Sequence, residues 1–247
     1  MGDLNGTKIA LGLALIALLA APPVASAPAG AKAQAAKAGL VTVTQSMQRG
    51  RPCVVLKNGR VALCLDLQQF TLVDMVDAAS GESFVAEPGS PLFRIAFGPD
   101  IIPPFTTPKP CAIDGSNARK RWFKVLNTGR AKTLELHFDD CRLTLDGNSA
   151  NVTVTVTLGP DDTVFSWGLR TKTSAPLPLG DVCFPTLSGL GSRLSGSRDA
   201  DYLVAPMGTG QRIEHPRTQG ACGQGTTEYP SGGVSIQMLA YCDGLRR

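Results

Sequence analysis

The chain has 247 residues, of which 43% are hydrophobic and 18% are charged. This length leaves ample room for a self-supporting core, in one large domain or two small ones. The formal net charge of +4 at pH 7 is small and the basic residues are scattered, which argues against a nucleic-acid-binding protein.

The N-terminal residues have the pattern of a secretory signal peptide, which we place at 1–29. Lys8 precedes a short apolar run, and small residues follow that run at the expected cleavage site. The run is too short to span a bilayer comfortably, so a membrane anchor is the weaker alternative and no membrane partner is expected. We therefore expect a secreted protein, with a leader at 30–39 and the folded domain at 40–247. In a host that glycosylates exported proteins, Asn151 lies in an acceptor pattern for a glycan.

Alternating apolar and polar residues dominate the sequence after residue 40, and this period of two predicts β-strands. Many short strands separated by glycine and proline turns are typical of a sandwich or barrel. We therefore expect an all-β fold, as a large antiparallel β-sandwich. Its strands are expected, in chain order, at 40–46, 61–67, 70–76, 92–97, 134–138, 141–145, 151–158, 165–170 and 234–241, with an irregular excursion over 188–211.

The seven cysteines of an exported chain favour disulfide bonds over zinc ligation, and no CxxC pair occurs. One bridge follows from Asn58-Gly59, which is a strong signal for a two-residue hairpin turn. That turn puts Cys53 directly opposite Cys64, at a separation that a disulfide tolerates. The alternative is a pair of buried free thiols, because the register is inferred from the turn.

Basic residues gather over 119–124, around Trp122. No nucleic-acid-binding motif surrounds them, so we interpret this segment as a solvated loop edge. Trp122 lies among charged residues and is the better surface candidate of the two tryptophans, so we expect it to stack on a sugar ring. Trp167 alternates with other apolar residues, which favours packing in the core.

The sequence contains no independent catalytic constellation. It has two histidines, of which His215 lies in a predicted loop, and neither GxSxG nor HExxH occurs. His137 shares a polar strand face with Glu135 and precedes the carboxylates at 139–140, so an acid–base pair is conceivable, although a solvent-facing strand histidine fits the period better. Turn chemistry explains the adjacent carboxylates at 139–140 and 161–162 better than glycosidase chemistry does. We therefore expect no catalytic residue, no metal and no cofactor.

Several residue groups near the two ends of the folded domain form a further pattern. They are 56–63, Leu65-Asp66-Leu67, 72–74 and 77–84 in the first part, and Phe184-Pro185, Tyr229-Pro230-Ser231 and 235–245 in the second. These groups resemble the opening and late strands of galactose-mutarotase-like sandwich domains. The resemblance is to an uncharacterised family of glycoside-hydrolase-like proteins related to endo-α-N-acetylgalactosaminidases. It covers most of the folded domain in spaced matches and implies a supersandwich that precedes a catalytic barrel.

In that family the barrel carries the catalytic carboxylates, and the chain stops at Arg247 before a barrel begins. We therefore expect a sandwich that is incomplete at its C-terminal end, with no catalytic residue carried over. Aldose epimerases share the sandwich, but the motifs around their paired histidines are missing here. The leading hypothesis is the carbohydrate-associated sandwich of a secreted glycosidase-like protein, without its C-terminal catalytic domain. The alternative is a stand-alone secreted lectin-like module that binds carbohydrate.

Overall fold

The computed structural model describes residues 40–85, 87–89, 91–97, 111–143, 147–177, 179–187, 189, 201–205, 211–214 and 240–243. Within these residues the chain forms β-strands and a single short 3-10 helix, so the predicted all-β fold is confirmed. No helix in this part of the chain is long and apolar enough to cross a bilayer. The predicted signal peptide and leader, His215 and Cys222 lie outside the described residues.

The first sheet contains four antiparallel strands in the order β1-β2-β3-β4. They are β1 (Thr42–Gln48), β2 (Arg51–Lys57), β3 (Val61–Asp66) and β4 (Leu72–Asp77). Arg49 and Gly50 form a two-residue turn between β1 and β2 and have positive φ angles of 49° and 74°, which suits a tight hairpin. Gly50 adopts this conformation freely, whereas the Arg49 side chain donates hydrogen bonds to Ser83 Oγ and the Val85 carbonyl, both at 2.6 Å. The first turn is thus tied to the segment after β4.

The second sheet contains four longer antiparallel strands in the order β10-β9-β8-β7. They are β7 (Ala118–Thr128), β8 (Ala131–Arg142), β9 (Ser149–Leu158) and β10 (Ser166–Thr173). β9 and β10 form the hairpin predicted for 151–158 and 165–170, and Val152, Val154 and Val156 are buried as their alternation predicts. The two strands expected at 134–138 and 141–145 are one continuous strand, β8, which ends at Arg142.

Two smaller sheets complete the described part of the chain. One has the order β11-β5-β6, from β5 (Arg94–Phe97), β6 (Cys111–Asp114) and β11 (Leu179–Cys183), and the helix η1 (Gly115–Asn117) follows β6. The other has the order β13-β12-β14, from β12 (Asp201–Ala205), β13 (Gln211–Glu214) and β14 (Ala240–Asp243). The prediction of an irregular excursion over 188–211 was therefore wrong where β12 lies. Strand β14 overlaps the end of the strand predicted at 234–241.

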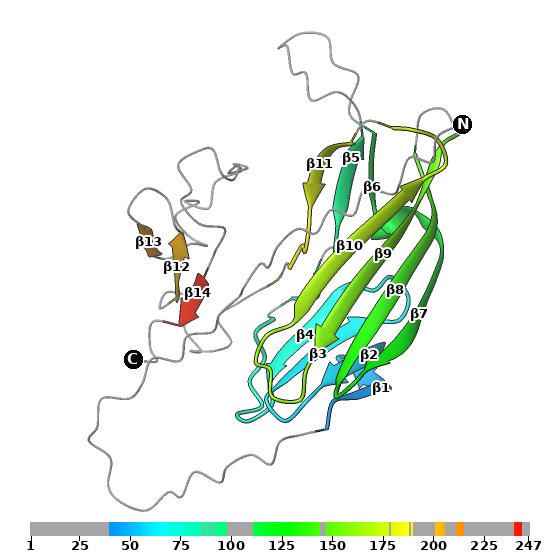
Figure 1. Cartoon of the computed structure of the whole chain (residues 1–247). Coiled ribbons are helices and arrows are strands. Elements are labelled where there is room, and N and C mark those ends of the chain that lie inside the picture. The colour runs from blue at the N-terminus through cyan, green and yellow to red at the C-terminus, as the bar shows by residue number, and fades with distance from the viewer. Residues whose placement is uncertain are drawn as a thin grey trace, which may run out of the picture.

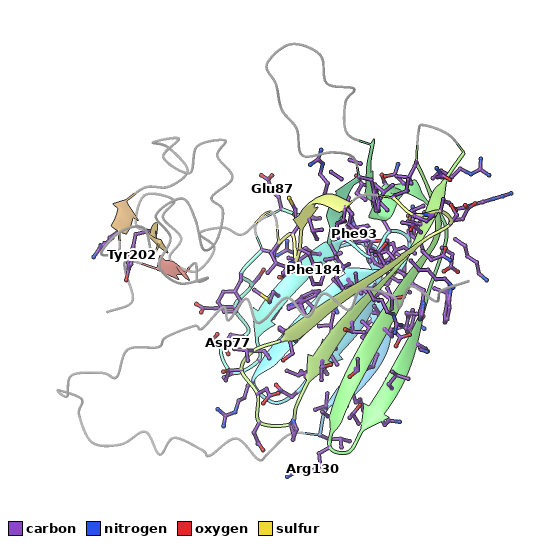
Figure 2. The ribbon with its side chains drawn as sticks, turned by 45° about the horizontal axis from the view of Figure 1, so that its top comes forward. Asp77, Glu87, Phe93, Arg130, Phe184 and Tyr202 are labelled. Carbon is purple, nitrogen blue, oxygen red and sulfur yellow. The ribbon has the colours of Figure 1, made fainter. Side chains whose placement is uncertain are left out.

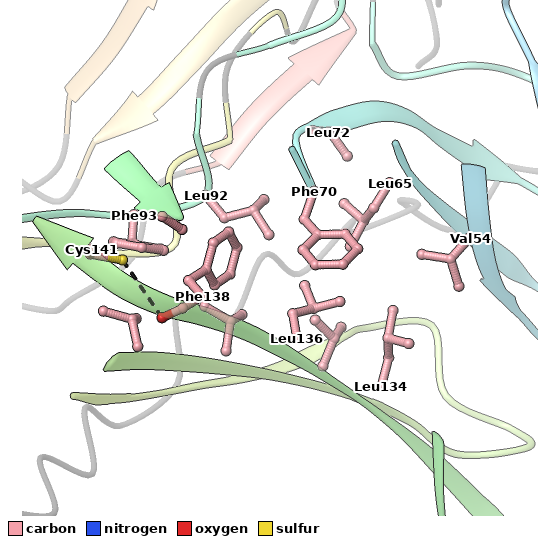
Figure 3. Packing of buried hydrophobic residues seen from close by; sticks show 14 of the residues in the cluster. Val54, Leu65, Phe70, Leu72, Leu92, Phe93, Leu134, Leu136, Phe138 and Cys141 are labelled. Carbon is pink, nitrogen blue, oxygen red and sulfur yellow. Dashed lines mark hydrogen bonds between the residues drawn. The ribbon is translucent and has the colours of Figure 1, made fainter. Parts of the chain in front are cut away.

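The first and second sheets pack face to face around one hydrophobic core (Figure 1). Figure 3 shows inward side chains of both sheets, among them Val54 and Leu65 of the first and Leu134 and Leu136 of the second. Phe138 of β8 lies between them, with its ring edge-on to Phe70 at 5.6 Å and to Phe93 at 4.9 Å between centroids. A fully buried side chain of this size contributes roughly 1.5–3 kcal/mol. Apolar burial therefore holds the two sheets together.

Different side chains lie at the two ends of this sandwich-like unit. Phe93 and Phe184 lie at the end near β5 and β11, and Arg130 lies at the opposite end, in the turn between β7 and β8 (Figure 2). The Phe184 ring is edge-on to Trp167, with 6.3 Å between the ring centroids. Both side chains are partly buried against the core, which confirms that Trp167 is a packing residue.

The hairpin between β2 and β3 has a longer loop than the sequence predicts, and this changes the cysteine pairing. The last pair between β2 and β3 is Lys57 with Ala62, which leaves residues 58–61 between them, so Cys53 is opposite Asp66 and Cys64 is opposite Val55. Diagonal cross-strand positions lie roughly 7–8 Å apart at Cα, beyond the reach of an unstrained disulfide. Both thiols are free and buried, so the predicted Cys53–Cys64 disulfide was wrong. They still share a face, because a register shift of two preserves the alternation.

Asn58 is the physical reason for the longer loop. Its side chain is buried, with 6% of the residue exposed. Asn58 Oδ1 accepts hydrogen bonds from the backbone N–H groups of Arg60 and Val61, at 2.8 and 2.9 Å. Asn58 Nδ2 donates to the carbonyl oxygens of Gly159 and Asp162, both at 2.8 Å, in the turn between β9 and β10. One side chain thus fixes a turn of each sheet.

Replacing Asn58 by alanine is expected to destabilise the fold by about 2–3 kcal/mol, because four backbone groups lose their partner in a buried place. Urea unfolding followed by circular dichroism measures this as a lower midpoint at an unchanged slope. Asn127→Ala is the matched control, since Asn127 is exposed and accepts a hydrogen bond from Lys132 Nζ. We expect a loss below about 0.5 kcal/mol for the control. Equal losses in the two variants contradict the role of Asn58.

The thiols of Cys53 and Cys64 are expected to be unreactive in the folded protein. Burial raises the pKa of the Cys64 thiol to about 12 and also raises the pKa of Cys53, and the thiolate is the reactive form. Iodoacetamide at pH 8 should therefore leave both cysteines unmodified in the folded state. Unfolding in denaturant without a reductant should then expose both to alkylation, as peptide mass spectrometry would show. Detection of a disulfide-linked pair of peptides that contain Cys53 and Cys64 would contradict this prediction and would support the two-residue turn instead.

Candidate functional site

The outward surface of the second sheet gathers the polar residues that the sequence singles out. Side chains alternate along each strand, so the residues between the core positions of β7 to β10 point to this side. We call this surface the outer face. Its main members are Lys120, Trp122, Lys124, Glu135, His137, Asp139, Thr153, Thr155, Arg170 and Lys172.

The strand register aligns these side chains in rows that cross the sheet. One row runs from β7 to β10 through Trp122, His137, Thr153 and Arg170. The next row runs through Lys124, Glu135, Thr155 and Gly168. Neighbouring strands lie roughly 4.8 Å apart, so side chains within a row are in reach of one another.

Trp122 is held in place by two contacts. Its indole ring is parallel to the His137 imidazole, with 3.7 Å between centroids and an interplanar angle of 1°. Its Nε1 donates a hydrogen bond of 2.7 Å to Asp139 Oδ2. The residue is 38% exposed, and since His137 covers one side of the indole, the exposed area belongs to the other side and the ring edges. The ring is therefore a fixed aromatic surface open to a ligand.

Glu135 connects His137 to Lys124. Its Oε1 lies 3.0 Å from Lys124 Nζ and 2.7 Å from His137 Nε2, and the second contact is an ion pair whenever the imidazole is protonated. The close approach of His137 Nε2 does not have hydrogen-bond geometry, so the contact is electrostatic rather than directed. Burial alone raises the pKa of Glu135, but the hydrogen bond and charge of Lys124, and then the charge of His137, outweigh burial and hold this pKa below 4.5.

The carboxylates at 139–140 lie in a β-bulge of β8 and not in the predicted turn. The pairing with β9 shifts by one residue between Phe138 and Cys141, and Asp140 has a positive φ of 52°. The Asp140 N–H donates a 2.9 Å hydrogen bond to Asn151 Oδ1, which stabilises the extra residue. The bulge ends the regular alternation next to Asp139, which remains beside Trp122.

The predictions for these residues are confirmed in part. Trp122 is at the surface as expected, but the segment 119–124 belongs to strand β7 and not to a loop edge. His137 is on the outward side of its strand, yet its side chain is only 14% exposed because Trp122 covers it. Of the two carboxylates considered as its partner, Glu135 contacts His137, whereas Asp139 contacts Trp122. The predicted turn over 161–162 lies between β9 and β10.

Sequence analysis missed strand β7 and with it the role of Lys124. The signal is present in the alternation of Phe123, which packs against the core, with Trp122 and Lys124, which point outward. The basic residues at 119–121 hide this period because they occupy both sides of the strand start. Lys124 therefore looked like one member of a charge cluster instead of the partner of Glu135.

The described residues contain no group of three or more His, Cys, Asp or Glu side chains that could hold a metal ion. The outer face instead combines one exposed aromatic ring, a buried carboxylate paired with a cation, and two threonine hydroxyls. Such a surface can bind a polar ligand with a flat apolar side, because the ring supplies dispersion contact and its neighbours supply hydrogen bonds.

Glu135→Gln is expected to make the stability of the fold less dependent on pH. The depressed pKa means that the ionised Glu135 stabilises the fold above pH 4.5, and that this contribution is lost as the pH falls through the folded-state pKa. We expect a loss of about 0.5–1 kcal/mol at pH 7, with allowance for the partial exposure of Lys124. The difference from the unsubstituted protein should shrink below pH 4.5, as urea unfolding at several pH values would show.

A Lys124→Met, Glu135→Gln double-mutant cycle at each pH isolates the pair. The coupling energy should fall toward zero together with the ionisation of Glu135. A coupling that is the same at pH 7 and pH 3 contradicts the assignment of the pKa shift to Lys124.

No protein-family model matches the chain, and no curated protein matches it in sequence. The resemblance to galactose-mutarotase-like sandwich domains therefore stays a prediction from the sequence, and the case for a function depends on the geometry of the outer face.

Proposed function

We propose that this chain is a carbohydrate-associated β-sandwich of a secreted glycosidase-like protein, and that a sugar ring binds against Trp122. The observation that carries the proposal is the fixed and partly exposed indole ring, parallel to His137 and hydrogen-bonded to Asp139. The proposal gives this chain the binding role and assigns bond cleavage to a separate catalytic domain, as the sequence resemblance implies.

The contacts of Trp122 suit a binding surface because they remove the freedom of its side chain before a ligand arrives. A ring that is already fixed loses little conformational entropy on binding, so more of the contact energy appears as affinity. A pyranose presents a flat side of C–H groups, which packs on an aromatic ring, and a rim of hydroxyl groups, which need hydrogen-bond partners. Lys124 and Asp139 lie beside the ring, Thr153 follows His137 in the same row, and all three can serve that rim.

The pair of His137 and Glu135 is better explained as support for Trp122 than as a catalytic acid and base. The imidazole ring is covered on one side by the indole, and its Nε2 lies 2.7 Å from Oε1 of the mostly buried Glu135. A general acid or base must reach the proton of its substrate directly or through one water molecule. His137 is therefore a positioning residue in this proposal.

Trp122→Ala should weaken binding to the preferred glycan about tenfold, which corresponds to the loss of roughly 1–1.5 kcal/mol of aromatic contact. A glycan array identifies the ligand, and isothermal titration calorimetry measures the affinity. Leu126→Ala is the matched control, because Leu126 is 39% exposed and points to the same side of the same strand. We expect no change in affinity for this control. Full affinity in a folded Trp122→Ala protein, or no glycan bound by the unsubstituted protein, rules the proposal out.

A further inference from the structure

The outer face carries more positive than negative charge that is open to a ligand. Both of its carboxylates are engaged within the face: Glu135 with Lys124 and His137, and Asp139 with Trp122. Lys120, Arg170 and Lys172 are exposed, and none of them forms an ion pair with a described carboxylate. Asp139 keeps its negative charge and lies opposite Lys120 in the strand register, so Arg170 and Lys172 are the two cations that remain for an external anion.

The strand register places the three exposed cations at two opposite edges of the outer face, and the Trp122 ring lies at one of these edges. Lys120 and Trp122 lie on β7, two residues apart, whereas Arg170 and Lys172 lie on β10. Trp122 and Arg170 share a row, so three strand spacings of roughly 4.8 Å, about 14 Å in total, separate them. A ligand that touches both edges is therefore an extended chain and not a single small ring.

The surface between the two edges is flat and polar. His137, Thr153 and Thr155 occupy the central strands. Gly168 on β10 lies opposite Thr155, and a Cβ atom at this position would lie 2.5 Å from Thr155 Oγ1. Glycine therefore keeps this row flat beside Arg170. The threonine hydroxyls can bond to sugar hydroxyl groups along the path between the edges.

We propose that the outer face binds an acidic glycan, a chain in which one sugar ring packs on Trp122 and a uronic acid carboxylate lies on Arg170 and Lys172. This inference rests on the proposed function and adds the chemical class of the ligand. A guanidinium group binds carboxylate and sulfate oxygens through two parallel hydrogen bonds, so Arg170 supplies geometry as well as charge. A neutral glycan leaves Arg170 and Lys172 without a partner and gains nothing from their charge.

Charge and composition favour an acidic glycan over a nucleic acid. Binding to single-stranded nucleic acid uses successive aromatic rings for successive bases and a positive groove along the backbone. Trp122 is the one exposed aromatic ring among the outer-face residues defined above, because it covers the His137 imidazole, and the net charge of the whole chain is only +4. Between its two edges the outer face offers hydroxyl groups, which match sugar hydroxyls.

The test uses the full folded protein and a panel of uronic acid polymers, polygalacturonate, alginate and hyaluronan, each with its neutral methyl-esterified form. The protein is produced in bacteria without glycosylation, because the acceptor Asn151 pairs with Lys172 across β9 and β10. Microscale thermophoresis at low salt and at physiological salt measures the affinity. We expect at least one acidic polymer to bind at least tenfold more tightly than its esterified form, with affinity that falls as salt increases.

The Arg170→Ala, Lys172→Ala double variant should lose at least tenfold in affinity for that polymer and most of the salt dependence. The matched control is Lys57→Ala with Arg60→Ala, which removes the same charge from exposed positions of the first sheet. We expect the control to bind as the unsubstituted protein does. Single-stranded DNA serves as a polyanion whose charges are phosphates and which contains no pyranose rings.

The outcomes separate this inference from the proposed function. Equal binding of esterified and acidic polymers that still depends on Trp122 overturns the acidic ligand and leaves the sugar-binding role in place. Binding that depends on Arg170 and Lys172 but not on Trp122 overturns the proposed function. DNA that binds as tightly as the polymers, an inactive panel, or a double variant with full affinity overturns the acidic-glycan assignment.

Discussion

The alternation of side chains along β8 is the constraint on which both sides of the second sheet depend. Leu134, Leu136 and Phe138 point into the core, while Glu135 and His137 point outward between them. A slip of one residue would exchange the two sets, so the burial of three large apolar side chains also fixes the carboxylate and the imidazole. The stacked rings and the ion pair are therefore positioned by the hydrophobic effect on the opposite side of the sheet.

Two polar side chains settle details that alternation leaves free. A shift of two residues keeps every side chain on its side, so the period cannot choose between a two-residue and a four-residue loop after β2. Asn58 selects the four-residue loop, because its four hydrogen bonds hold it between the turns of both sheets. Asn151 stabilises the bulge at Asp140 by accepting a hydrogen bond from the Asp140 N–H. Strand β8 therefore continues beyond its outer-face residues.

These two kinds of interaction explain how much the sequence could predict. The all-β class, the strand at 151–158, the surface position of Trp122 and the burial of Trp167 all follow from a local period, and they agree with the structure. The cysteine register failed because it depends on contacts between Asn58 and residues about a hundred positions away. The partner of His137 could be narrowed to two carboxylates, but the choice needed the neighbouring strand, where Lys124 holds Glu135 and Trp122 takes Asp139.

Among the described residues, β7 is the last strand in its sheet, so one side of its backbone has no described strand beside it in that sheet. Free strand edges invite another chain to pair, and lysine and arginine side chains along an edge discourage this because a second strand would have to bury them. Arg119, Lys120, Arg121 and Lys124 line this eleven-residue edge. The basic segment that the sequence indicated as a solvated loop edge is thus a charged strand edge, which disfavours pairing with a second chain.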